Sequence, residues 1–392
     1  MSSSLQLVIL GMMGRCPFGG QSWLYLNWLR GLARLGHEVW YVEDDSVWPY
    51  DPTKDTPTDD CSYAVRHIAS CMDRIGLPER WAFRLVDDDN VCCASAGMSP
   101  QKLNALYRSC DALLNVGGVT ALRPEHLVAR SRVYVETDPV IVELQIAAAN
   151  GQAWSPLTEH NQAITYGENY GAPDCGVPLN GISFGKTRQP IDLELWPMAY
   201  QADAKFFTTI GNYRQNGNDV EYNGEVYHWS KHHEWEKFLE LPQHTTQPFE
   251  LAVMPDTTEE QQRLMKHGWR LVPPFEMSLD IFGAYQEFFR RSRAEFSVAK
   301  DQNVRLRSGW FSERDACYLA CGKPVVAQDT GFSNVLPTGQ GLFGFSTNDE
   351  ALAAIDAINS DYRRNCEAAR AIAEEYFRAE TVAARFLQNI GF

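Results

Sequence analysis

The sequence predicts two α/β domains, each a doubly wound and mostly parallel sheet, facing each other across a cleft. Three observations favour this fold class. The chain has 392 residues, which is long for a single hydrophobic core. Short apolar runs alternate with longer stretches of 3.6-residue periodicity, the order expected of βαβ units. The alternation pauses in a stretch rich in Gly and Pro, 154–196, and then starts again. We therefore expect the two domains to join near 190–204.

The first half opens with a βαβ unit. Residues 5–10 form an apolar run that ends at Gly11, residues 21–35 have helical periodicity, and 38–42 form the next predicted strand. The same alternation then continues. Helices are expected at 63–75 and 100–109, and strands at 112–116, 132–135 and 164–167.

The second half repeats the pattern, so both halves are predicted to be Rossmann-like. Strands are expected at 205–210, 249–253, 270–272, 294–299 and 324–327. Helices are expected at 235–239, 259–267, 282–291, 312–320, 349–359, 362–377 and 380–388. Between the first of these strands and the first helix, the polar and aromatic segment 213–229 is a predicted hairpin with Asn223-Gly224 as its turn.

Composition narrows the class of protein. The net charge of −15 argues against broad nucleic-acid binding, which depends on clustered Lys and Arg. The ten cysteines show no C-x-x-C spacing, as expected of reduced thiols in a cytoplasmic protein. The N-terminus lacks the basic region of a signal peptide, and no window of about 20 apolar residues occurs, so no membrane span is expected.

The most informative segment is 308–329. It contains a glycine loop, a helix that Ser312 can cap, a stop at Gly322-Lys-Pro, and a short apolar strand. Glu313 and Asp315 lie in the first turn of that helix, where negative charge suits the helix dipole. A glycine loop that leads into a helix N-terminus is a phosphate site, because unpaired N–H groups converge there.

Cations flank this segment. Lys300, Arg305 and Arg307 directly precede it and could clamp a diphosphate, or they could form a solvated basic loop. Gly211-Asn212 end the first strand of the second domain, and Lys231 follows the predicted hairpin. Lys231 could reach an anionic ligand or be an ordinary surface lysine.

The first domain offers candidates at the carboxyl ends of its strands, where ligands bind in open α/β sheets. The loop 11–20 has glycines in the order G-x-x-G-x-x-x-x-G-G, which is neither the dinucleotide fingerprint nor the P-loop. It could approach a substrate closely or be a structural turn. Gly117-Gly118 and Thr137-Asp138 end two further strands and should face the same cleft.

Asp138 is the first candidate for contact with a substrate hydroxyl, although capping of the following helix is an equal alternative. His160 and Glu168, in the irregular segment, are further candidate bases. Trp23, close to the glycine loop, could line a cleft for a flat or apolar ligand or pack inside a helix layer.

The second half also carries a family resemblance. Gly-Trp-Phe-Ser at 309–312 is similar to the Gly-Trp-Asn-Ser segment of nucleotide-sugar-dependent plant enzymes, and 320–326 match an Ala-x-Gly-x-Pro-Val-Val strand entry. Gln328-Asp-Thr-Gly331, Gly341 and the helix at 349–353 follow in the same order as in the large retaining family. The chain thus resembles glycosyltransferases of the two-Rossmann-domain GT-B architecture, with the specific match over about residues 294–377.

The resemblance implies a nucleotide-sugar donor bound mainly by the second domain, a small-molecule acceptor such as a natural product bound mainly by the first, and sugar transfer in the cleft. It divides the chain into 1–195, 196–376 and a final helix, 377–392, that packs back on the first domain. The donor-binding residues would be Gly211, Asn212, Lys231, Lys300, Arg305, Arg307, Ser308, Gly309, Trp310, Phe311, Ser312, Glu313, Asp329, Thr330 and Gly331. The acceptor-binding residues would be Gly19, Gly20, Trp23, Gly118 and Thr137. No D-x-D run occurs in the appropriate domain, so neither a required metal nor a cofactor besides the donor is expected.

The chain departs from the family at two positions. Cys317 stands where a ribose-binding glutamate is expected, which leaves that role to Glu313 or Asp315. Arg307-Ser308 stand where inverting plant enzymes place a histidine, so the stereochemical outcome stays open. Two alternatives remain: a nucleotide-sugar epimerase, which needs a buried pair of carboxylates that the sequence does not reveal, and a non-catalytic nucleotide- or sugar-binding protein.

Overall fold

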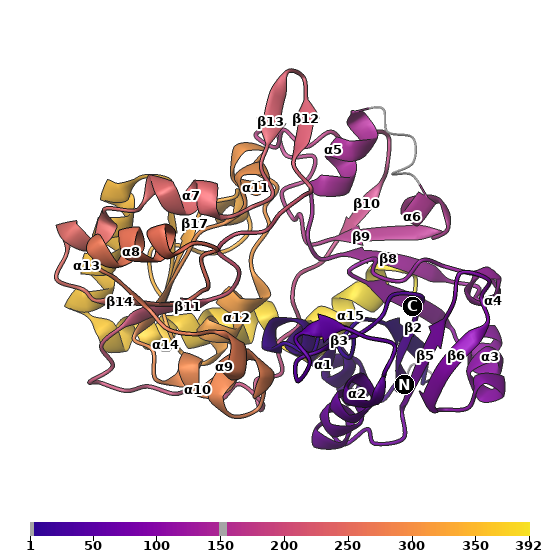
Figure 1. The fold of residues 1–392 in the computed structure, drawn as a ribbon. Coiled ribbons are helices and arrows are strands. Elements are labelled where there is room, and N and C mark those ends of the chain that lie inside the picture. Colours follow the sequence, from indigo (N-terminus) through magenta and orange to yellow (C-terminus); the bar gives the residue numbers. More distant parts are fainter. Residues whose placement is uncertain (1–3, 149–154) are drawn as a thin grey trace.

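The computed structural model describes residues 4–148 and 155–392, and Figure 1 shows them as two α/β halves side by side. The larger sheet, in the first half, has the strand order β10-β9-β8-β7-β1-β2-β5-β6. All its neighbouring strands are parallel except β5 and β6, which are antiparallel. Its strands are β1 (Gln6–Leu10), β2 (Glu38–Asp45), β5 (Trp81–Val86), β6 (Cys92–Gly97), β7 (Ala112–Val116), β8 (Arg132–Glu136), β9 (Gln162–Thr165) and β10 (Phe184–Lys186).

The smaller sheet, in the second half, is entirely parallel and has the order β15-β14-β11-β16-β17-β18. Most of its residues are buried on both faces, which explains their nearly continuous apolar sequence. Phe249, Trp269 and Phe296 pack ring against ring in its core. Its strands are β11 (Phe207–Ile210), β14 (Phe249–Ala252), β15 (Trp269–Leu271), β16 (Ala294–Ser297), β17 (Val325–Gln328) and β18 (Leu342–Phe345).

Helices surround both sheets (Figure 1). Those of the first half are α1 (Gly19–Arg34), α2 (Ser62–Arg74), α3 (Pro100–Ser109), α4 (Pro124–Leu127), α5 (Ile141–Ala147) and α6 (Ser155–Thr158). Those of the second half are α7 (His232–Lys237), α8 (Thr258–Lys266), α9 (Phe275–Leu279), α10 (Ala284–Arg290), α11 (Asp301–Arg305), α12 (Glu313–Ala320), α13 (Asn348–Ser360) and α14 (Tyr362–Ile372). Short 3₁₀ turns occupy Leu241–His244 and Phe332–Asn334. Among the described residues, no helix has the length and apolar character that crossing a bilayer requires.

Two small hairpins complete the structure. One pairs β3 (Tyr50–Asp51) with β4 (Thr56–Pro57), and the other pairs β12 (Val220–Tyr222) with β13 (Glu225–Tyr227). Asn223 and Gly224 form the turn of the second hairpin with φ of 53° and 78°. Two consecutive positive φ values characterise the type I′ turn, so the predicted Asn-Gly hairpin is confirmed. It projects between the two halves in Figure 1.

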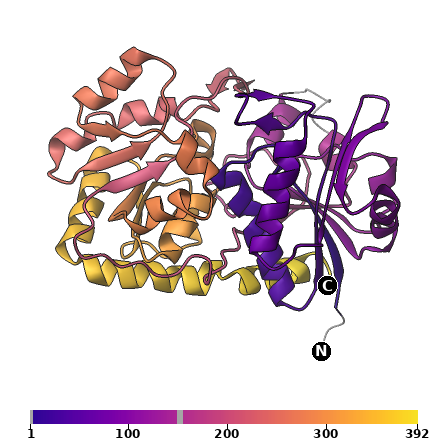
Figure 2. The same cartoon turned by 60° about the horizontal axis from the view of Figure 1, so that its bottom comes forward.

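The end of the chain returns to the first half. After α14, a π-helical turn (Ala373–Phe377) leads into α15 (Ala379–Asn389), which runs beneath the first half in Figure 2. There α15 packs on α1, with the rings of Trp28 and Phe386 4.8 Å apart. At the crossing, Ile191 donates its N–H to the carbonyl of Phe377 (2.7 Å) and accepts from the N–H of Ala379 (3.0 Å). The two passages of the chain between the halves are therefore hydrogen-bonded to each other.

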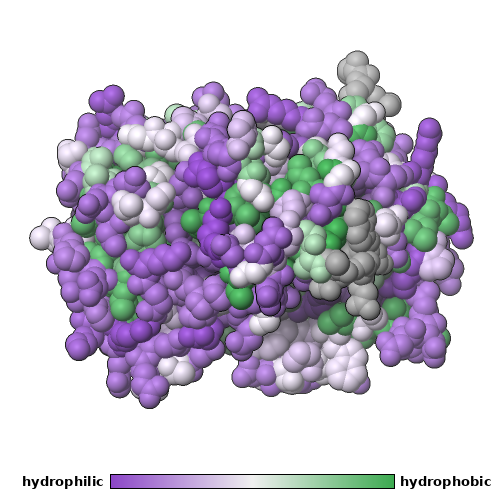
Figure 3. Space-filling model, turned by 90° about the horizontal axis from the view of Figure 1, so that it is seen from above, coloured by the Kyte–Doolittle hydropathy of each residue, from purple (hydrophilic) through white to green (hydrophobic). Residues whose placement is uncertain are grey.

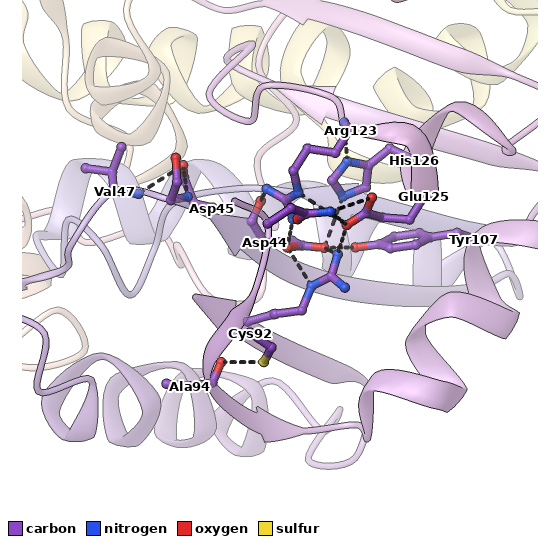
Figure 4. Close-up of polar contacts among 12 residues, drawn as sticks. Asp44, Asp45, Val47, Cys92, Ala94, Tyr107, Arg123, Glu125 and His126 are labelled. Carbon is purple, nitrogen blue, oxygen red and sulfur yellow. Dashed lines mark hydrogen bonds and ion pairs between the residues drawn. The ribbon is translucent and has the colours of Figure 1, made fainter. Parts of the chain in front are cut away.

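A buried network of charged and polar side chains joins β2 and β5 of the larger sheet to α3 and α4 (Figure 4). Asp44, fully buried at the end of β2, accepts hydrogen bonds from Arg84 of β5 (2.8 and 2.5 Å) and Tyr107 of α3 (2.8 Å), and pairs with Arg123 and His126. Burial alone would raise the pKa of Asp44, but the hydrogen bonds from His126 and Arg84 hold it well below its usual range. Asp44 thus has a structural role.

Several elements of the structure were not predicted from the sequence, among them strands β5, β6, β10 and β18 and helix α11. Arg84 interrupts the apolar run of β5, where only the ion network of Asp44 makes a buried guanidinium tolerable. The edge strand β6 is mostly exposed and lacks the apolar alternation of a half-buried strand. The predicted helix 362–377 divides into α14 and the π-helical turn.

Candidate active site

The loop and helix at 308–331 have the predicted local structure. Ser312 caps α12, because its Oγ accepts a hydrogen bond from the N–H of Arg314 (3.2 Å). Gly309 has a φ of 81°, and an added Cβ would collide with the backbone nitrogen of Asn169 in the other half. Its N–H donates to the carbonyl of Thr330 (2.8 Å). The loop therefore requires glycine both for its conformation and for the close approach of the two halves.

The site lies at the switch point of the smaller sheet, where β11 and β16 are neighbours and the strand order runs outward in both directions. Gly211 and Asn212 follow β11, and Lys300 closely follows β16. These residues lie at the carboxyl ends of the strands, facing the first half. The strand order of the sheet therefore brings together Gly211, Asn212 and Lys300, which the sequence analysis had singled out.

Lys231 occupies the centre of the site. Its Nζ lies 5.3 Å from the ring centroid of Trp310, and no described residue pairs with it through a hydrogen bond or an ion pair. Burial, the neighbouring guanidinium of Arg314 and Lys300 lower the pKa of Lys231 to about 7. The carboxylates of Asp315 and Asp138 act in the opposite direction, but neither forms an ion pair with the ammonium, so Lys231 is available to an anionic ligand.

Lys300 connects the two halves. It is 5% exposed, and its ammonium pairs with the carboxylate of Asp138, which lies at the carboxyl end of β8 in the first half. The ring of Trp229 covers the ammonium, with Nζ 2.9 Å from the ring centroid. Burial lowers the pKa of Lys300, and Asp138 opposes that effect. Asp138 therefore lies in the cleft, as expected, but is held there by a cation of the other half.

Sequence reasoning missed Arg314, the third cation. Its guanidinium donates to Glu295 (2.5 Å), to the carbonyl of Ile210 (2.8 Å) and to Ser297 (2.8 Å). An added Cβ at Gly211 would lie 2.9 Å from Nη1 of Arg314, so a larger residue there would displace the guanidinium. The available signal for Arg314 was its position in the first turn of α12, where the helix dipole disfavours a cation.

Two small cavities adjoin these cations and share Val298 as a wall. One, of about 190 Å³, is lined mainly by the donor loop and its neighbours, including Ser297, Val298, Trp310, Phe311, Asp315, Gln328 and Thr330. The other, of about 210 Å³, is lined by Thr209, Gly211, Asn212, Lys231, Trp235, Val253, Val298 and Arg314. Ligand sites usually measure about 300–1,000 Å³, so a nucleotide-sized ligand requires the cleft to widen.

Several predicted donor residues have structural partners instead. Arg305 lies outside both cavities: it pairs with Glu225 of the hairpin and donates to the carbonyl of Val226 (2.7 Å). In this structure α11 directs Arg305 to the hairpin, and its place in the donor site stays a prediction. Arg307 (φ 48°) pairs with Asp174 of the first half (2.7 Å) and with Asp329 (3.3 Å).

The turn after β17 is closed by its own residues. Asp329 accepts from the N–H groups of Gly331 (3.0 Å) and Ser333 (3.3 Å), and Thr330 donates to the carbonyl of Trp310 (2.5 Å). Ser308 is fully buried and donates to Asn303 (2.6 Å). These contacts fix the loop that carries Trp310.

Glu313 faces the first half. Its Oε1 accepts from the amide of Asn27 in α1 (2.8 Å), and burial raises its pKa to about 8. Asp315, by contrast, lines the cavity under the donor loop. Of the two carboxylates that could replace the expected ribose ligand at Cys317, Asp315 is therefore the one in position.

His160 and Glu168 lie away from the cavities. His160 is enclosed between Tyr134 and Asn115, with its Nε2 3.2 Å from the amide nitrogen of Asn115, and burial lowers its pKa to about 4. Glu168 pairs with Arg188 (2.6 Å). Both have structural partners, and their assignment as catalytic bases is wrong on geometric grounds.

The predicted acceptor residues lie where the halves touch. Trp23 is 1% exposed, and its indole N–H donates to the carbonyl of Ile281 in the second half (3.0 Å). Its role is packing, and the acceptor-cleft interpretation is wrong. Gly19 donates to Ser278 (3.3 Å), and an added Cβ would meet the ring of Tyr285.

Three predicted acceptor residues differ in their surroundings. Gly20 is exposed, with only the hydroxyl of Tyr285 near its open side (3.8 Å). An added Cβ at Gly118 would collide with the ring of Tyr134. Thr137 remains in the cleft, where its carbonyl accepts from the indole of Trp310 (3.1 Å).

Two groups of buried acids were not predicted. Glu43 lies near the end of β2 and accepts from the N–H groups of Gly14 and Arg15 (3.0 Å to Arg15), and burial raises its pKa to about 7. Glu136 and Glu143 share the hydroxyl of Tyr170 (3.4 and 3.1 Å). Both carboxyls of that pair are almost fully buried, and burial raises the pKa of Glu136 well above its usual range.

The surface above the site is mixed in character. Seen from above, the molecule is largely hydrophilic, with hydrophobic patches near the middle of this face (Figure 3).

Comparison with solved structures identifies this architecture as the GT-B fold of glycosyltransferases, which confirms the predicted fold class. An alpha-glucosyltransferase in complex with UDP and a 13-mer DNA is 11% identical, with a TM-score of 0.62 and coverage of 100% of both chains. HepE from Anabaena, in complex with UDP and glucose, is 12% identical, with a TM-score of 0.58 over 98% of this chain and 99% of that chain. Sucrose-phosphate synthase from Thermosynechococcus elongatus is 12% identical, with a TM-score of 0.53 over 98% of each chain. By sequence, the chain matches no protein-family profile and no curated protein.

Proposed function

We propose that the protein is a glycosyltransferase that moves a sugar from a nucleoside-diphosphate sugar to a hydroxyl group of a small-molecule acceptor. The single observation that carries the proposal is the unpaired ammonium of Lys231, between Arg314 and Lys300 at the switch point of the smaller sheet. A diphosphate supplies the missing negative charge at that place. UDP is present in two of the similar structures, and we therefore propose a UDP-sugar as the first donor to test.

The departing diphosphate gains negative charge during sugar transfer. Lys231 and the N–H groups at the start of α12 would stabilise that charge, because they are fixed before the reaction begins. Arg314 would contribute its positive charge through space, since its own donors are used by Glu295, Ile210 and Ser297. These residues would together lower the barrier for breaking the sugar–phosphate bond.

Asp138 and Lys300 would exchange partners on donor binding. In the structure, the ammonium of Lys300 is neutralised by Asp138. A diphosphate in the adjoining cavity would compete for that ammonium and release the carboxylate of Asp138 toward the acceptor. Asp138 would then orient the acceptor hydroxyl, or remove its proton if the reaction inverts configuration.

A small-molecule acceptor is in keeping with the surface. The net charge of −15 disfavours a polyanionic acceptor such as nucleic acid, although one similar structure contains DNA. Hydrophobic patches near the middle of the face in Figure 3 fit an acceptor with an apolar part. We place the enzyme in the cytoplasm, since all ten cysteines are unpaired.

Thermal unfolding of the full chain with UDP and a panel of other nucleotides and sugar nucleotides tests the donor site. We expect UDP to raise the unfolding temperature of the wild type, and Lys231→Ala to weaken UDP binding by at least about tenfold, the loss typical of a charge-assisted contact. Lys266→Ala, at an exposed position of α8, is the matched control and should bind as the wild type does. If no nucleoside diphosphate stabilises the wild type, the proposal is wrong.

Product analysis distinguishes the three functions. A transferase releases the nucleoside diphosphate and forms a glycosylated acceptor, whereas an epimerase changes the sugar without an acceptor. A binding protein retains the donor unchanged with every acceptor.

A further inference from the structure

Three metal-ligating side chains meet at the base of the β12–β13 hairpin. Asp219 precedes β12, His228 follows β13, and His233 lies in the first turn of α7. One ligand atom of each lies within 4.8 Å of the other two. The Oδ2 atom of Asp219 is 2.9 Å from Nδ1 of His228, and the rings of His228 and His233 are stacked with centroids 3.8 Å apart.

The histidines at this cluster favour an ion. No described residue forms a hydrogen bond with the side chain of His233, although it is partly buried. The ring of His232 lies 3.8 Å from that of His233 on the side away from the hairpin and interacts with Arg214 (2.9 Å). Stacked imidazoles repel each other when both are protonated, and neutral imidazole is the form that binds metals.

The charges around the cluster also favour a cation. Asp301 of α11 accepts from the N–H of His228 (3.0 Å), and Asp219 accepts from the N–H of Trp229 (2.8 Å). Asp301 also pairs with Arg305 (3.4 Å), and Arg214 pairs with Glu260 and contacts His232. Asp219 pairs with no arginine or lysine among the described residues, so its carboxylate is the one available to a cation.

We propose that Asp219, His228 and His233 bind a divalent transition-metal ion of the Zn²⁺ type, with water as a further ligand. Two imidazole nitrogens and one carboxylate oxygen form a typical zinc ligand set with an open position. Mg²⁺ and Ca²⁺ prefer sites built from oxygen ligands and should not bind here.

A bound ion would fix the geometry of the cluster. The three ligand atoms lie within 4.8 Å of one another, and two atoms that each lie about 2.1 Å from one ion can be at most about 4.2 Å apart. The ion would therefore hold the base of the hairpin close to α7. The site would act as a clamp between two elements that the sequence connects through only a few residues.

The bound ion would also affect the donor site, an inference that rests on the proposed function. The segment between His228 and His233 carries Trp229, whose ring covers Lys300, and Lys231, which lies over Trp310. An ion bound at both ends of this segment would restrict the positions of both lysines. Metal binding would then tighten the binding of a diphosphate without the metal touching it.

Calorimetry with ZnCl₂ alone, on the full chain without a histidine tag and after chelator treatment, tests the site independently of donor and activity. We expect one equivalent to bind the wild type. His233→Ala and Asp219→Asn should each weaken binding by at least about tenfold. His244→Ala, at an exposed histidine outside the cluster, should bind as the wild type does. MgCl₂ should give no binding.

Other outcomes would overturn the site. Absence of zinc binding by the wild type would do so, as would wild-type affinity in His233→Ala. Cys92 and Cys93 are exposed and adjacent, so they are a competing source of zinc ligands. If Cys92→Ser/Cys93→Ser abolished binding while His233→Ala retained it, the ion would belong to the thiols. Thermal unfolding without metal shows that each variant is folded, and Asp219→Asn preserves the shape of the side chain if His233→Ala is unstable.

Discussion

Asn27 of α1 donates its amide N–H to Glu313 of α12, 286 positions later in the chain, at a distance of 2.8 Å. The carbonyl oxygen of the same amide accepts from the N–H of Asp192 (3.0 Å), in the segment that joins the halves. One asparagine thus links the first half, the junction and the first turn of the donor helix. Glu313, whose place in the first turn of α12 suits the helix dipole, therefore also stabilises the interface between the two halves.

Glu313 should make stability depend on pH. Its pKa in the folded protein is raised to about 8 by burial, whereas an unfolded glutamate titrates near 4.5. Between these values the folded state binds more protons, so the free energy of unfolding should fall as pH rises, by up to about 5 kcal/mol in total. Chemical denaturation from pH 4.5 to 9 should show this decline in the wild type and a flatter profile in Glu313→Gln. Glu259→Gln, at an exposed site, should keep the wild-type slope.

Asp138→Asn should separate donor binding from turnover. Because Asp138 neutralises Lys300, its removal should free the ammonium for a diphosphate and tighten UDP binding about two- to fivefold. Turnover should fall at the same time, because the group that orients the acceptor is lost. Calorimetry with UDP and product formation measure the two effects. Glu380→Gln, which removes the α15–α1 contact to Arg34, is the control for loss of an ion pair away from the cleft. Weaker UDP binding by Asp138→Asn would contradict the partner exchange.

Gly309→Ala should lower the free energy of unfolding more than Gly217→Ala, a matched change at another glycine with positive φ. Gly309 and Gly217 have φ of 81° and 82°, but nothing lies within 4 Å of an added Cβ at Gly217. Gly217→Ala should cost only the strain of the left-handed conformation, about 1–2 kcal/mol. Gly309→Ala adds a collision with the backbone of Asn169 and should exceed that cost by at least about 1 kcal/mol. Urea denaturation of both variants measures the difference, and equal losses would show that the halves adapt to the extra methyl group.

Asp44→Asn should weaken the larger sheet. Arg84, Arg123 and His126 surround the carboxylate, and removal of one partner of a buried pair leaves the others uncompensated (Figure 4). We expect a loss of about 3–5 kcal/mol in the free energy of unfolding. Asp88→Asn, at an exposed acid beyond β5, should change it by less than about 0.5 kcal/mol. UDP affinity should be unchanged in both variants.

The sequence predicts local features well where one residue determines the backbone. Ser312 as a cap and Asn223-Gly224 as a hairpin turn depend on short-range chemistry, and the structure contains both. Buried parallel strands were also recognised, because burial on both faces requires a continuous apolar run. Strand β5 escaped recognition because its arginine is compatible with burial only through acids and histidine that are distant in the sequence.

The site was harder to predict than the fold. Lys231 and Lys300 follow strands and were found by position, but the partners that decide their roles come from other elements: Trp310, Trp229 and Asp138. The contacts of Arg305 with the hairpin and of Trp23 with Ile281 could not be predicted for the same reason, since no sequence pattern shows which element a cation or a ring will contact. Three-dimensional neighbours determine what a side chain does, and these come from the topology.

The hydrogen bonds that Ile191 makes with Phe377 and Ala379 determine how the molecule can open. Since both passages of the chain between the halves are joined at this point, separation of the halves by translation would break these bonds, whereas rotation about them would not. If the halves separate, we therefore expect them to rotate about a pivot near α15. The segments that lie on the opposite side of the molecule in Figure 1, α11 and α5, would then move farthest. The ion pair of Lys300 and Asp138, next to those helices, would be one of the contacts between the halves that such a rotation breaks.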